Sequence, residues 1–398
     1  MQPVATLEIG TQKVRVLVGE YRADNQLYIS GVGEVLSSGV RKSEIVDLDN
    51  ALACVKEALK LAEQSAQREI FEVHMLFSGG HIDCTVNQGM VNVMGDDQVI
   101  TDVEIENVMN NARALNLPME RQILHSICQH FYVDDGRPVV NPEGMEGRRL
   151  TLDMLCMHGV RNRIRNTIRV AEEAHLDVED AAFGGLCAGL AVLTSAQKEG
   201  GAIVVDLGAG STDYVVYANK AIKFAGSLAV GGDHVTNDIA LGLKISTAQA
   251  EKLKVDHGAA KAVPAQQSKI IEIPAESGFE GKKVPLHDLN IIIECRMREI
   301  FEMVRKDIEK EMRDYQISAG VILTGGGSFL TEVEELAGKH FNLTASIGRA
   351  HSVTGIKRVA EGPDFVSSIG LLRYGLRNRE KQESSTTLSG VFKRIFGG

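Results

Sequence analysis

Short apolar runs at the start of the chain predict a group of strands and one helix. Three runs are strand-like and are separated by turns: Val4–Glu8, Val14–Glu20 and Leu27–Val35. Asp47–Ala66 then carries apolar residues at helical spacing, and the apolar run Phe71–Ser78 ends at two glycines. The pattern therefore predicts three antiparallel strands, a helix and a further strand.

A similar series begins again at Gly201. Its strand-like segments are Ala202–Asp206, Asp213–Ala218 and Lys220–Ala229. A helical tract over about Asn290–Tyr315 and a strand at Gly320–Thr324 come later. The repeated strand order predicts two related lobes that face each other across a cleft. A helix over about Glu179–Leu193 would join them.

The remaining segments complete the expected organisation of an α/β chain. Asp102–Leu115 looks helical, and Arg121–Val133 and Arg149–Cys156 look like strands, so together they predict a small inserted module. The polar stretch Val255–Leu289 contains three prolines and is expected to be exposed or loosely folded.

These segments predict definite boundaries along the chain. We expect the first lobe at 1–82 and 162–194, an inserted subdomain at 83–161, and the second lobe at 195–366 with an insertion at about 228–305. A return helix at 367–378 would lead back to the first lobe, followed by a flexible linker at 379–389 and an amphipathic helix at 390–398.

Composition narrows the class of protein. The 398 residues are 44% hydrophobic, which suffices for two cores, and the net charge of −10 argues against a nucleic-acid partner. The six cysteines are scattered without a CxxC pair, so we expect free thiols rather than a zinc site or a disulfide framework. No secretion signal is evident, and no apolar stretch reaches about 20 residues. Any membrane contact would therefore be peripheral.

Three glycine-rich turns carry the candidate chemistry. The first, residues 8–13 (EIGTQK), and the second, residues 206–213 (DLGAGSTD), each connect two strands. The third, residues 323–328 (LTGGGS), leads from a strand into a helix. Glycine lets backbone N–H groups approach phosphate oxygens closely. Each turn alone is more often a structural connection, but two such hairpins in repeated lobes favour a phosphate site.

Carboxylates stand beside the first two turns. A carboxylate that faced a phosphate directly would be repelled, but a carboxylate can hold Mg²⁺ through water. This role fits Glu8, Asp206 and Asp213.

With their flanks, the three turns resemble the phosphate-1, phosphate-2 and adenosine motifs of the actin superfamily. Within it, the chain most resembles the FtsA family of bacterial cell-division proteins. The similar segments span essentially the whole chain: LEIGTQKVRVLVGE, HIDCTVNQGMV, VVDLGAGSTDY, GGDHVTNDIA, ILTGGGSFL and SSIGLLRYG. The resemblance implies an actin-like (ribonuclease H-like) two-lobe fold with a nucleotide cleft and a small α+β subdomain inserted in the first lobe.

The resemblance also implies positions around ATP or ADP and Mg²⁺. It places against the phosphates Gly10, Thr11, Gln12, Lys13, Asp206, Gly208, Gly210, Ser211 and Thr212. It places against adenosine Gly325, Gly326, Gly327 and Ser328. Glu251 and Lys254 resemble the pair that contacts ribose and base, and an ordinary solvent-facing ion pair is the alternative. Gly231 and Gly232 would close over the phosphates or form a simple turn.

Two departures from related ATPases bear on hydrolysis. Glu8 stands where many actin relatives have Asp, and the run 183–186 (FGGL) has no acidic or amide residue where filament ATPases position the attacking water. Without a positioned base, phosphoryl transfer to water loses much of its catalysis. We therefore expect ATP binding with slow hydrolysis at most, and Asp213 is the remaining candidate to orient a water.

The last residues predict a peripheral membrane anchor. One helical face would carry Val391, Phe392, Ile395 and Phe396, and the other Lys393 and Arg394. A basic amphipathic helix behind a polar linker is typical of segments that lie on a membrane surface. Packing of this tail on its own domain, or disorder, is the alternative.

The resemblance implies partners as well. FtsA proteins polymerise on the cytoplasmic face of the inner membrane at the division site, bind anionic lipids and the C-terminal peptide of FtsZ, and help to recruit later divisome membrane proteins. The inserted subdomain would serve filament contacts and this recruitment. A helix in the second lobe has cations that could hold an acidic peptide: Arg296, Arg298, Arg305 and Lys306. A solvated helix face is the alternative.

Two other interpretations stay open on the sequence. A small-molecule kinase of the same fold would need a base beside the γ-phosphate, and no candidate stands outside the phosphate hairpins. A type IV pilus assembly protein of the PilM kind would share the nucleotide motifs without the polar linker and amphipathic terminus. Deletion of residues 391–396 would abolish a midcell ring position only in an FtsA protein.

Overall fold

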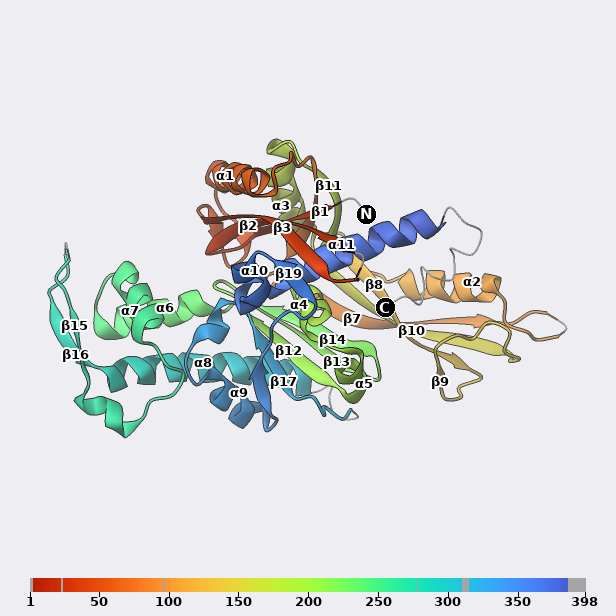
Figure 1. Ribbon diagram of the computed structural model, residues 1–398. Coiled ribbons are helices and arrows are strands. Elements are labelled where there is room, and N and C mark those ends of the chain that lie inside the picture. The colour runs from red at the N-terminus through yellow and green to blue at the C-terminus, as the bar shows by residue number, and fades with distance from the viewer. Residues whose placement is uncertain (1–2, 23, 96, 277, 310–314, 386–398) are drawn as a thin grey trace.

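Two stacked sheets with helices between and outside them form the body of the molecule (Figure 1). The computed structural model describes residues 3–22, 24–95, 97–276, 278–309 and 315–385. Within these residues, no helix is long and apolar enough to span a bilayer. The two sheets correspond to the two lobes that the repeated sequence pattern predicts.

The first lobe is built on a six-stranded sheet in the order β11-β6-β1-β2-β3-β19. Its strands are β1 (Val4–Ile9), β2 (Lys13–Tyr21), β3 (Leu27–Leu36), β6 (Glu72–Phe77), β11 (Asp177–Phe183) and β19 (Val353–Gly355). β1 pairs antiparallel with β2 and parallel with β6. A small hairpin, β4 (Val40–Arg41) and β5 (Glu44–Ile45), stands beside this sheet.

The second lobe repeats this topology in the order β14-β13-β12-β17-β18. Its strands are β12 (Ala202–Leu207), β13 (Thr212–Ala218), β14 (Ala221–Leu228), β17 (Val321–Thr324) and β18 (Ala345–Ile347). β12 takes the place of β1, because it pairs antiparallel with β13 and parallel with β17. Apart from β19 at the edge of the first sheet, the strands of each lobe, counted along the chain, follow the same order: third, second, first, fourth, fifth. The predicted pair of related lobes is confirmed.

Helices lie in three layers around the two sheets (Figure 1). Between the sheets, α4 (Gly184–Val192) packs on the second and α11 (Val366–Ser385) on the first. The outer face of the first sheet is covered by α1 (Leu48–Ala66) and α3 (Arg161–Glu173). The outer face of the second sheet is covered by α8 (Leu286–Glu309) and α9 (Val333–Phe341). Short pieces connect these layers: α5 (Ser195–Gly200), α10 (Lys357–Glu361), η2 (Gly326–Phe329) and η3 (Pro363–Phe365).

The inserted α+β subdomain of the first lobe has its own sheet and its own core. The sheet, in the order β7-β10-β8-β9, is antiparallel throughout. It consists of β7 (Asp83–Asn92), β8 (Arg121–Val133), β9 (Pro138–Val139) and β10 (Arg149–Val160), and α2 (Asp102–Arg113) covers one face. Thr101 and Glu104 cap the start of α2 reciprocally, which stabilises this helix. Apolar residues of α2 and the sheet form a separate cluster.

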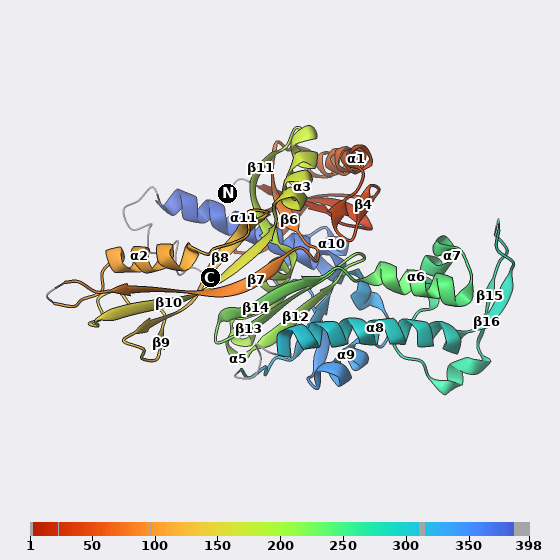
Figure 2. The same cartoon turned by 180° about the vertical axis from the view of Figure 1, so that it is seen from behind.

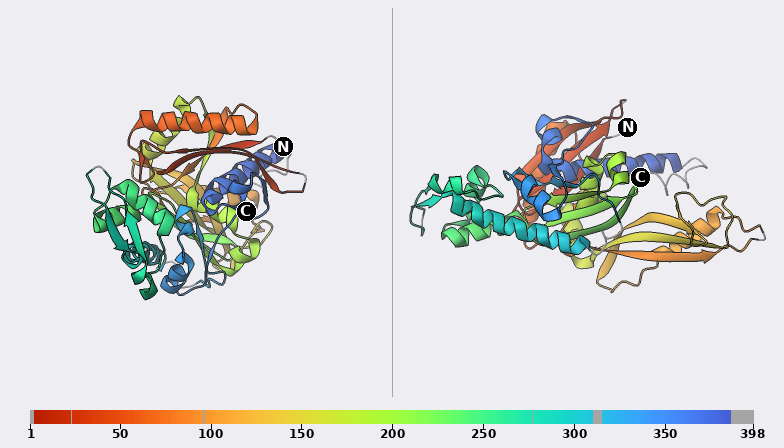
Figure 3. Two further views of the ribbon diagram at one scale, coloured as in Figure 1. Left: turned by 60° about the vertical axis from the view of Figure 1, so that its left-hand side comes forward. Right: turned by 90° about the horizontal axis from the view of Figure 1, so that it is seen from below.

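A second extension lies at the opposite end of the molecule (Figures 2 and 3). It consists of α6 (Gly232–Leu243), α7 (Thr247–His257), η1 (Pro264–Ser268), the hairpin β15 (Ile270–Ile273) and β16 (Lys282–Pro285), and one end of α8. Tyr214 on β13 donates a hydrogen bond of 2.6 Å to Asp307 on α8, which ties α8 to the second sheet.

Three expectations about elements are wrong. The joining segment is not helical from Glu179, because residues up to Phe183 pair with β6 as a strand and the helix begins at Gly184. The stretch Val255–Leu289 is exposed at many positions, as one alternative expected, but the expectation of loose folding is wrong, since it contains a hairpin and the start of α8. The linker does not begin at Arg379, because α11 continues to Ser385. Within this helix, Arg379 donates a hydrogen bond of 2.8 Å to Glu179. Residues 386–398, with the predicted anchor, lie outside the described residues.

Candidate functional site

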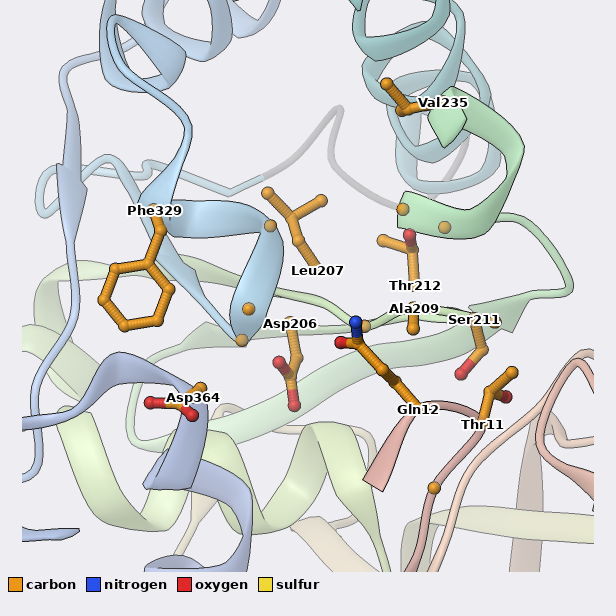
Figure 4. Close-up of a pocket in the computed structure, with 18 of the residues that line it drawn as sticks. Thr11, Gln12, Asp206, Leu207, Ala209, Ser211, Thr212, Val235, Phe329 and Asp364 are labelled. Atoms are coloured by element: carbon orange, nitrogen blue, oxygen red, sulfur yellow. The ribbon is translucent and has the colours of Figure 1, made fainter. Parts of the chain in front are cut away.

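A cavity of about 750 Å³ lies between the lobes, where the glycine-rich turns of both sheets meet (Figure 4). Its lining includes the first and second hairpins, the third turn, and the facing ends of α6 and α7. The repeated topology explains this meeting, because each hairpin follows the first strand of its lobe. Most of the predicted site residues therefore line one cavity.

The first hairpin connects β1 to β2 and places two polar side chains at the cavity. Gly10 donates its N–H to the carbonyl of Lys13 at 3.0 Å, which closes the turn. Gln12 reaches across the cleft and donates to Glu251 at 3.3 Å. The ammonium of Lys13 instead pairs with Glu34 at 2.7 Å, so it is directed to the sheet rather than to the centre of the cavity.

The second hairpin connects β12 to β13 and touches the first. A Cβ at Gly210 would overlap the hydroxyl oxygen of Thr11, so only glycine permits this approach. Thr11 and Ser211 lie near each other in Figure 4, as this contact requires. Thr212 is fully buried and donates its hydroxyl to the carbonyl of Val230 at 2.8 Å.

Three carboxyl groups lie at the base of the hairpins, and each accepts a hydrogen bond from a serine. Ser368 donates to Glu8, Ser367 donates to Asp206, and Ser227 donates to Asp213. Ser367 and Ser368 come from the first turn of α11.

Burial dominates the electrostatics of two of these groups. It raises the pKa of Asp206 to about 6 and that of Asp213 to about 7, and the proximity of Asp206 adds to the rise at Asp213. Within the described residues, no group of three or more His, Cys, Asp or Glu side chains is arranged to ligate a metal ion directly. A divalent cation near the carboxyl groups would favour their ionised forms, and carboxylates can hold such a cation through water.

Asp213 is enclosed on several sides. It is 4% exposed, and Ser227 and Ser78 both hydrogen-bond it. A Cβ at Gly184 would come within 2.6 Å of its carboxyl oxygen, so the start of α4 packs directly against it.

The third turn follows β17 and also requires glycine. Gly325 has φ +81°, and a Cβ there would overlap a carboxyl oxygen of Asp206. Gly326 and Gly327 line the cavity. Ser328 does not face a ligand as expected, because it is fully buried and its hydroxyl donates to the carbonyl of Gly325 at 2.7 Å. The next residue, Phe329, is 63% exposed and lines the cavity instead (Figure 4).

Helices α6 and α7 form the far wall of the cavity. Gly232 donates its N–H to the carbonyl of Gly208 at 2.9 Å, so the start of α6 is fixed to the second hairpin. Lys254 pairs with Glu251 at 2.6 Å and donates to the carbonyl of Gly232 at 3.1 Å. The side chains are 14% and 30% exposed. Because the pair joins α7 to α6, it is more than an isolated solvent-facing ion pair.

A buried arginine that the sequence interpretation did not include supports the first hairpin. Arg15 on β2 bonds Glu34 and Asp364 at 2.8 Å each, and lies 3.7 Å from Glu8. This network joins β2 to η3, the segment through which the chain returns to the first lobe.

The cations predicted on α8 all have acidic neighbours. Arg296 bonds Asp238 on α6, and burial of this pair is partial. Arg298 pairs with Glu294 at 2.6 Å, whereas Arg305 and Lys306 both approach Glu302. The helix therefore presents paired charges rather than an unopposed cationic cluster.

Two similar sheets with a cavity between their hairpins define an actin-like protein. Solved structures agree on the fold: the PilM–PilN type IV pilus biogenesis complex (15% identity, covering 94% of this chain and 98% of that chain, TM-score 0.66), and MreB5 of Spiroplasma citri bound to ADP (14% identity, covering 96% and 99%, TM-score 0.58).

Sequence comparison identifies the family within this class. Residues 203–370 match the family model described as cell division protein FtsA, and residues 79–158 match the SHS2 domain inserted in FtsA. The chain is 31% identical to FtsA of Pseudomonas aeruginosa, covering 97% of this chain and 92% of that protein. It is 31% identical to FtsA of Escherichia coli K12, covering 94% and 90%. The chain belongs to the FtsA family of cell division proteins.

Proposed function

We propose that the cavity between the lobes binds Mg-ATP or Mg-ADP. The observation that carries this proposal is the meeting of two glycine hairpins from repeated lobes at one cavity, next to three carboxyl groups. Backbone N–H groups of both hairpins would surround the phosphates from opposite sides. Glu8, Asp206 and Asp213 would hold Mg²⁺ through water.

The nucleoside would extend from the phosphates toward the third turn and α7. Gly326 leaves open space there, because a Cβ built on it would meet no described atom within 4 Å outside its two chain neighbours. The exposed ring of Phe329 supplies an apolar surface for a base, and Glu251 and Lys254 supply polar groups for ribose or base.

Hydrolysis would be slow at most. Asp213 is the candidate to orient a water, and its serine and Gly184 neighbours occupy its surroundings. A pKa of about 7 leaves it only partly ionised at neutral pH before a cation binds, and a general base must be ionised to accept a proton.

The nucleotide-bound chain would act in division as a polymer on the inner membrane. Residues 390–398 would lie on the cytoplasmic face as an amphipathic anchor, and the second-lobe extension would receive the C-terminal peptide of FtsZ. The inserted subdomain would support filament contacts and recruit later divisome proteins. The paired charges of α8 would have to exchange partners to bind an acidic peptide.

Titration calorimetry of the full chain tests nucleotide binding. We expect one saturable site for Mg-ATP and for Mg-ADP. Lys254→Met should weaken both by about tenfold, because it removes charge from the far wall of the cavity. Lys60→Met, on the exposed side of α1, is the matched control and should bind like the wild type. A folded wild-type chain that takes up neither nucleotide would refute the proposal.

A further inference from the structure

The tip of the β4–β5 hairpin has an uncommon backbone. Its two residues, Lys42 and Ser43, have φ of +52° and +61°. Two-residue turns of this kind favour glycine or asparagine, because a Cβ is strained in the left-handed region. Neither position is glycine here, so contacts around the tip must hold this conformation.

Contacts from three elements hold the tip. The N–H of Ser43 donates to the hydroxyl oxygen of Thr11 at 2.9 Å, which joins the tip to the first hairpin. Glu44 pairs with Arg163 on α3 at 2.6 Å. Behind the tip, the N–H groups of Val46 and Asp47 both donate to the carbonyl of Gly39, at 2.8 and 3.0 Å. The strained turn is therefore fixed on the first lobe.

This conformation brings a hydroxyl group to the boundary between the lobes. Ser43 lines the cavity, and its hydroxyl shares a hydrogen bond of 2.9 Å with the hydroxyl of Ser211 on the second hairpin. The Cα of Lys42 lies 2.8 Å from where a Cβ of Gly210 would stand. The first hairpin and the β4–β5 tip of the first lobe therefore meet the second hairpin of the second lobe at one point.

Positive charge lies near the same point. Burial first, and then the ammonium of Lys42, lower the pKa of His234 in the first turn of α6. The side chain of Lys42 is exposed, so its ammonium is accessible to an anion.

We propose that Ser43 is a third phosphate contact, which distinguishes a nucleoside triphosphate from a diphosphate. This inference rests on the proposed nucleotide site. Each serine hydroxyl has one proton to donate and two lone pairs that accept. When a terminal phosphate is bound, Ser43 and Ser211 both donate to its oxygens and so hold the two lobes together. When a diphosphate is bound, no oxygen reaches this point and the two hydroxyls bond each other, as in this structure.

Calorimetry with two nucleotides tests the proposal on the full chain. The ligands are Mg-ADP and the magnesium complex of a non-hydrolysable ATP analogue. Ser43→Ala removes the hydroxyl, and Ser43→Gly removes it while relieving the strained φ. Both should lower the ratio of triphosphate to diphosphate affinity by about tenfold, which is the effect of losing one hydrogen bond to a charged oxygen. Ser30→Ala on β3, whose hydroxyl donates to the carbonyl of Val18, is the control.

The outcomes separate this proposal from the one on which it rests. If the ratio of triphosphate to diphosphate affinity is unchanged in both Ser43 variants, the role of Ser43 is refuted. An equal loss of affinity for both nucleotides counts as an unchanged ratio, and neither result contradicts the nucleotide site itself. A wild-type chain that binds neither nucleotide would refute both. A lowered ratio in the alanine and glycine variants, with an unchanged ratio in the control, is the result that supports the proposal.

Discussion

At the scale of single residues, buried carboxyl groups make the folding of this chain depend on pH. Burial raises the pKa of Asp213 from 3.8 to about 7. The folded chain thus holds this proton more tightly than the unfolded chain does. Its contribution to stability is fully present below pH 4 and is lost as the pH rises to about 7. A bound cation would reverse this loss, because it stabilises the ionised form.

Asp213→Asn tests this dependence. The variant carries no charge at this position, so it should match the wild type near pH 4. Above pH 7 it should exceed the wild type in free energy of unfolding, by about 2–4 kcal/mol. Urea denaturation without nucleotide or Mg²⁺, from pH 4 to 8, measures the difference. Asp102→Asn, in the exposed first turn of α2, is the control for the loss of a surface carboxyl group. A difference that stays constant across this range would contradict the assignment.

The sequence predicted the glycines and carboxylates of the site, but not the residues that support them. Each glycine-rich turn is a short continuous segment (EIGTQK, DLGAGSTD or LTGGGS), so it can be recognised from its own sequence. Ser43, Ser227 and Ser367 reach the hairpins from other elements, and their roles depend on tertiary contacts. The segment SSIGLLRYG was used only as part of the family resemblance, although its serines Ser367 and Ser368 bond Asp206 and Glu8. The prediction that Ser328 faces adenosine is wrong, because the turn directs its hydroxyl back to the carbonyl of Gly325.

At the scale of elements, periodicity predicted most strands and helices, and tertiary contacts decided the exceptions. α1 and α2 match the helical spacing closely. Glu179 and Asp180 look helical in composition, yet pairing with β6 makes them part of a strand. The polar residues after Asn378 look like a linker, but Arg379 bonds both Glu72 and Glu179, so the helix persists. Local propensity cannot reveal such partners.

The packing of α4 on α11 makes a prediction about stability. A Cβ at Gly370 would overlap the carbonyl of Cys187, which is backbone and cannot rotate away. Gly370→Ala should therefore force the helices apart and lower the free energy of unfolding by about 3 kcal/mol. Because Ser367 and Ser368 begin α11, nucleotide affinity should fall as well.

Urea denaturation and calorimetry measure the two effects. Gly200→Ala is the matched control, since the nearest atom to its Cβ would be Ser318 Cβ at 3.6 Å, an ordinary contact. Equal stability of Gly370→Ala and the wild type would show that the helices can separate without cost.

At the scale of the whole molecule, the two extensions lie at opposite ends (Figure 3), and helices α6 and α7 of the second extension line the cavity between the lobes. The inserted subdomain has a core of its own, whereas the second-lobe extension shares one core with the second sheet. A chain of this shape can contact neighbours at both ends while its lobes hold a nucleotide. Polymerisation would then place many copies of the terminal segment along one line.

Avidity decides whether such a segment can hold the polymer on a membrane. Four partly inserted apolar side chains would contribute roughly 4–6 kcal/mol of gross attraction, and Lys393 and Arg394 would add about 1 kcal/mol each near anionic lipid. Ordering the segment would cancel much of this attraction, so a single copy would bind weakly. Along a filament, each further contact becomes intramolecular and strengthens the whole. Membrane binding should therefore rise steeply at the protein concentration where polymers form.

Co-sedimentation with vesicles of mixed anionic and neutral lipid tests this, over a range of protein concentrations with and without ATP. Deletion of residues 391–396 should abolish binding at every concentration. Lys393→Gln with Arg394→Gln keeps the apolar face, so it should weaken binding to anionic vesicles while binding to neutral vesicles stays unchanged. Binding that survives the deletion would mean that residues 391–396 are not the anchor. Binding that is hyperbolic from the lowest concentrations would mean that single chains carry the affinity. Polymerisation and membrane attachment would then be independent properties of the chain.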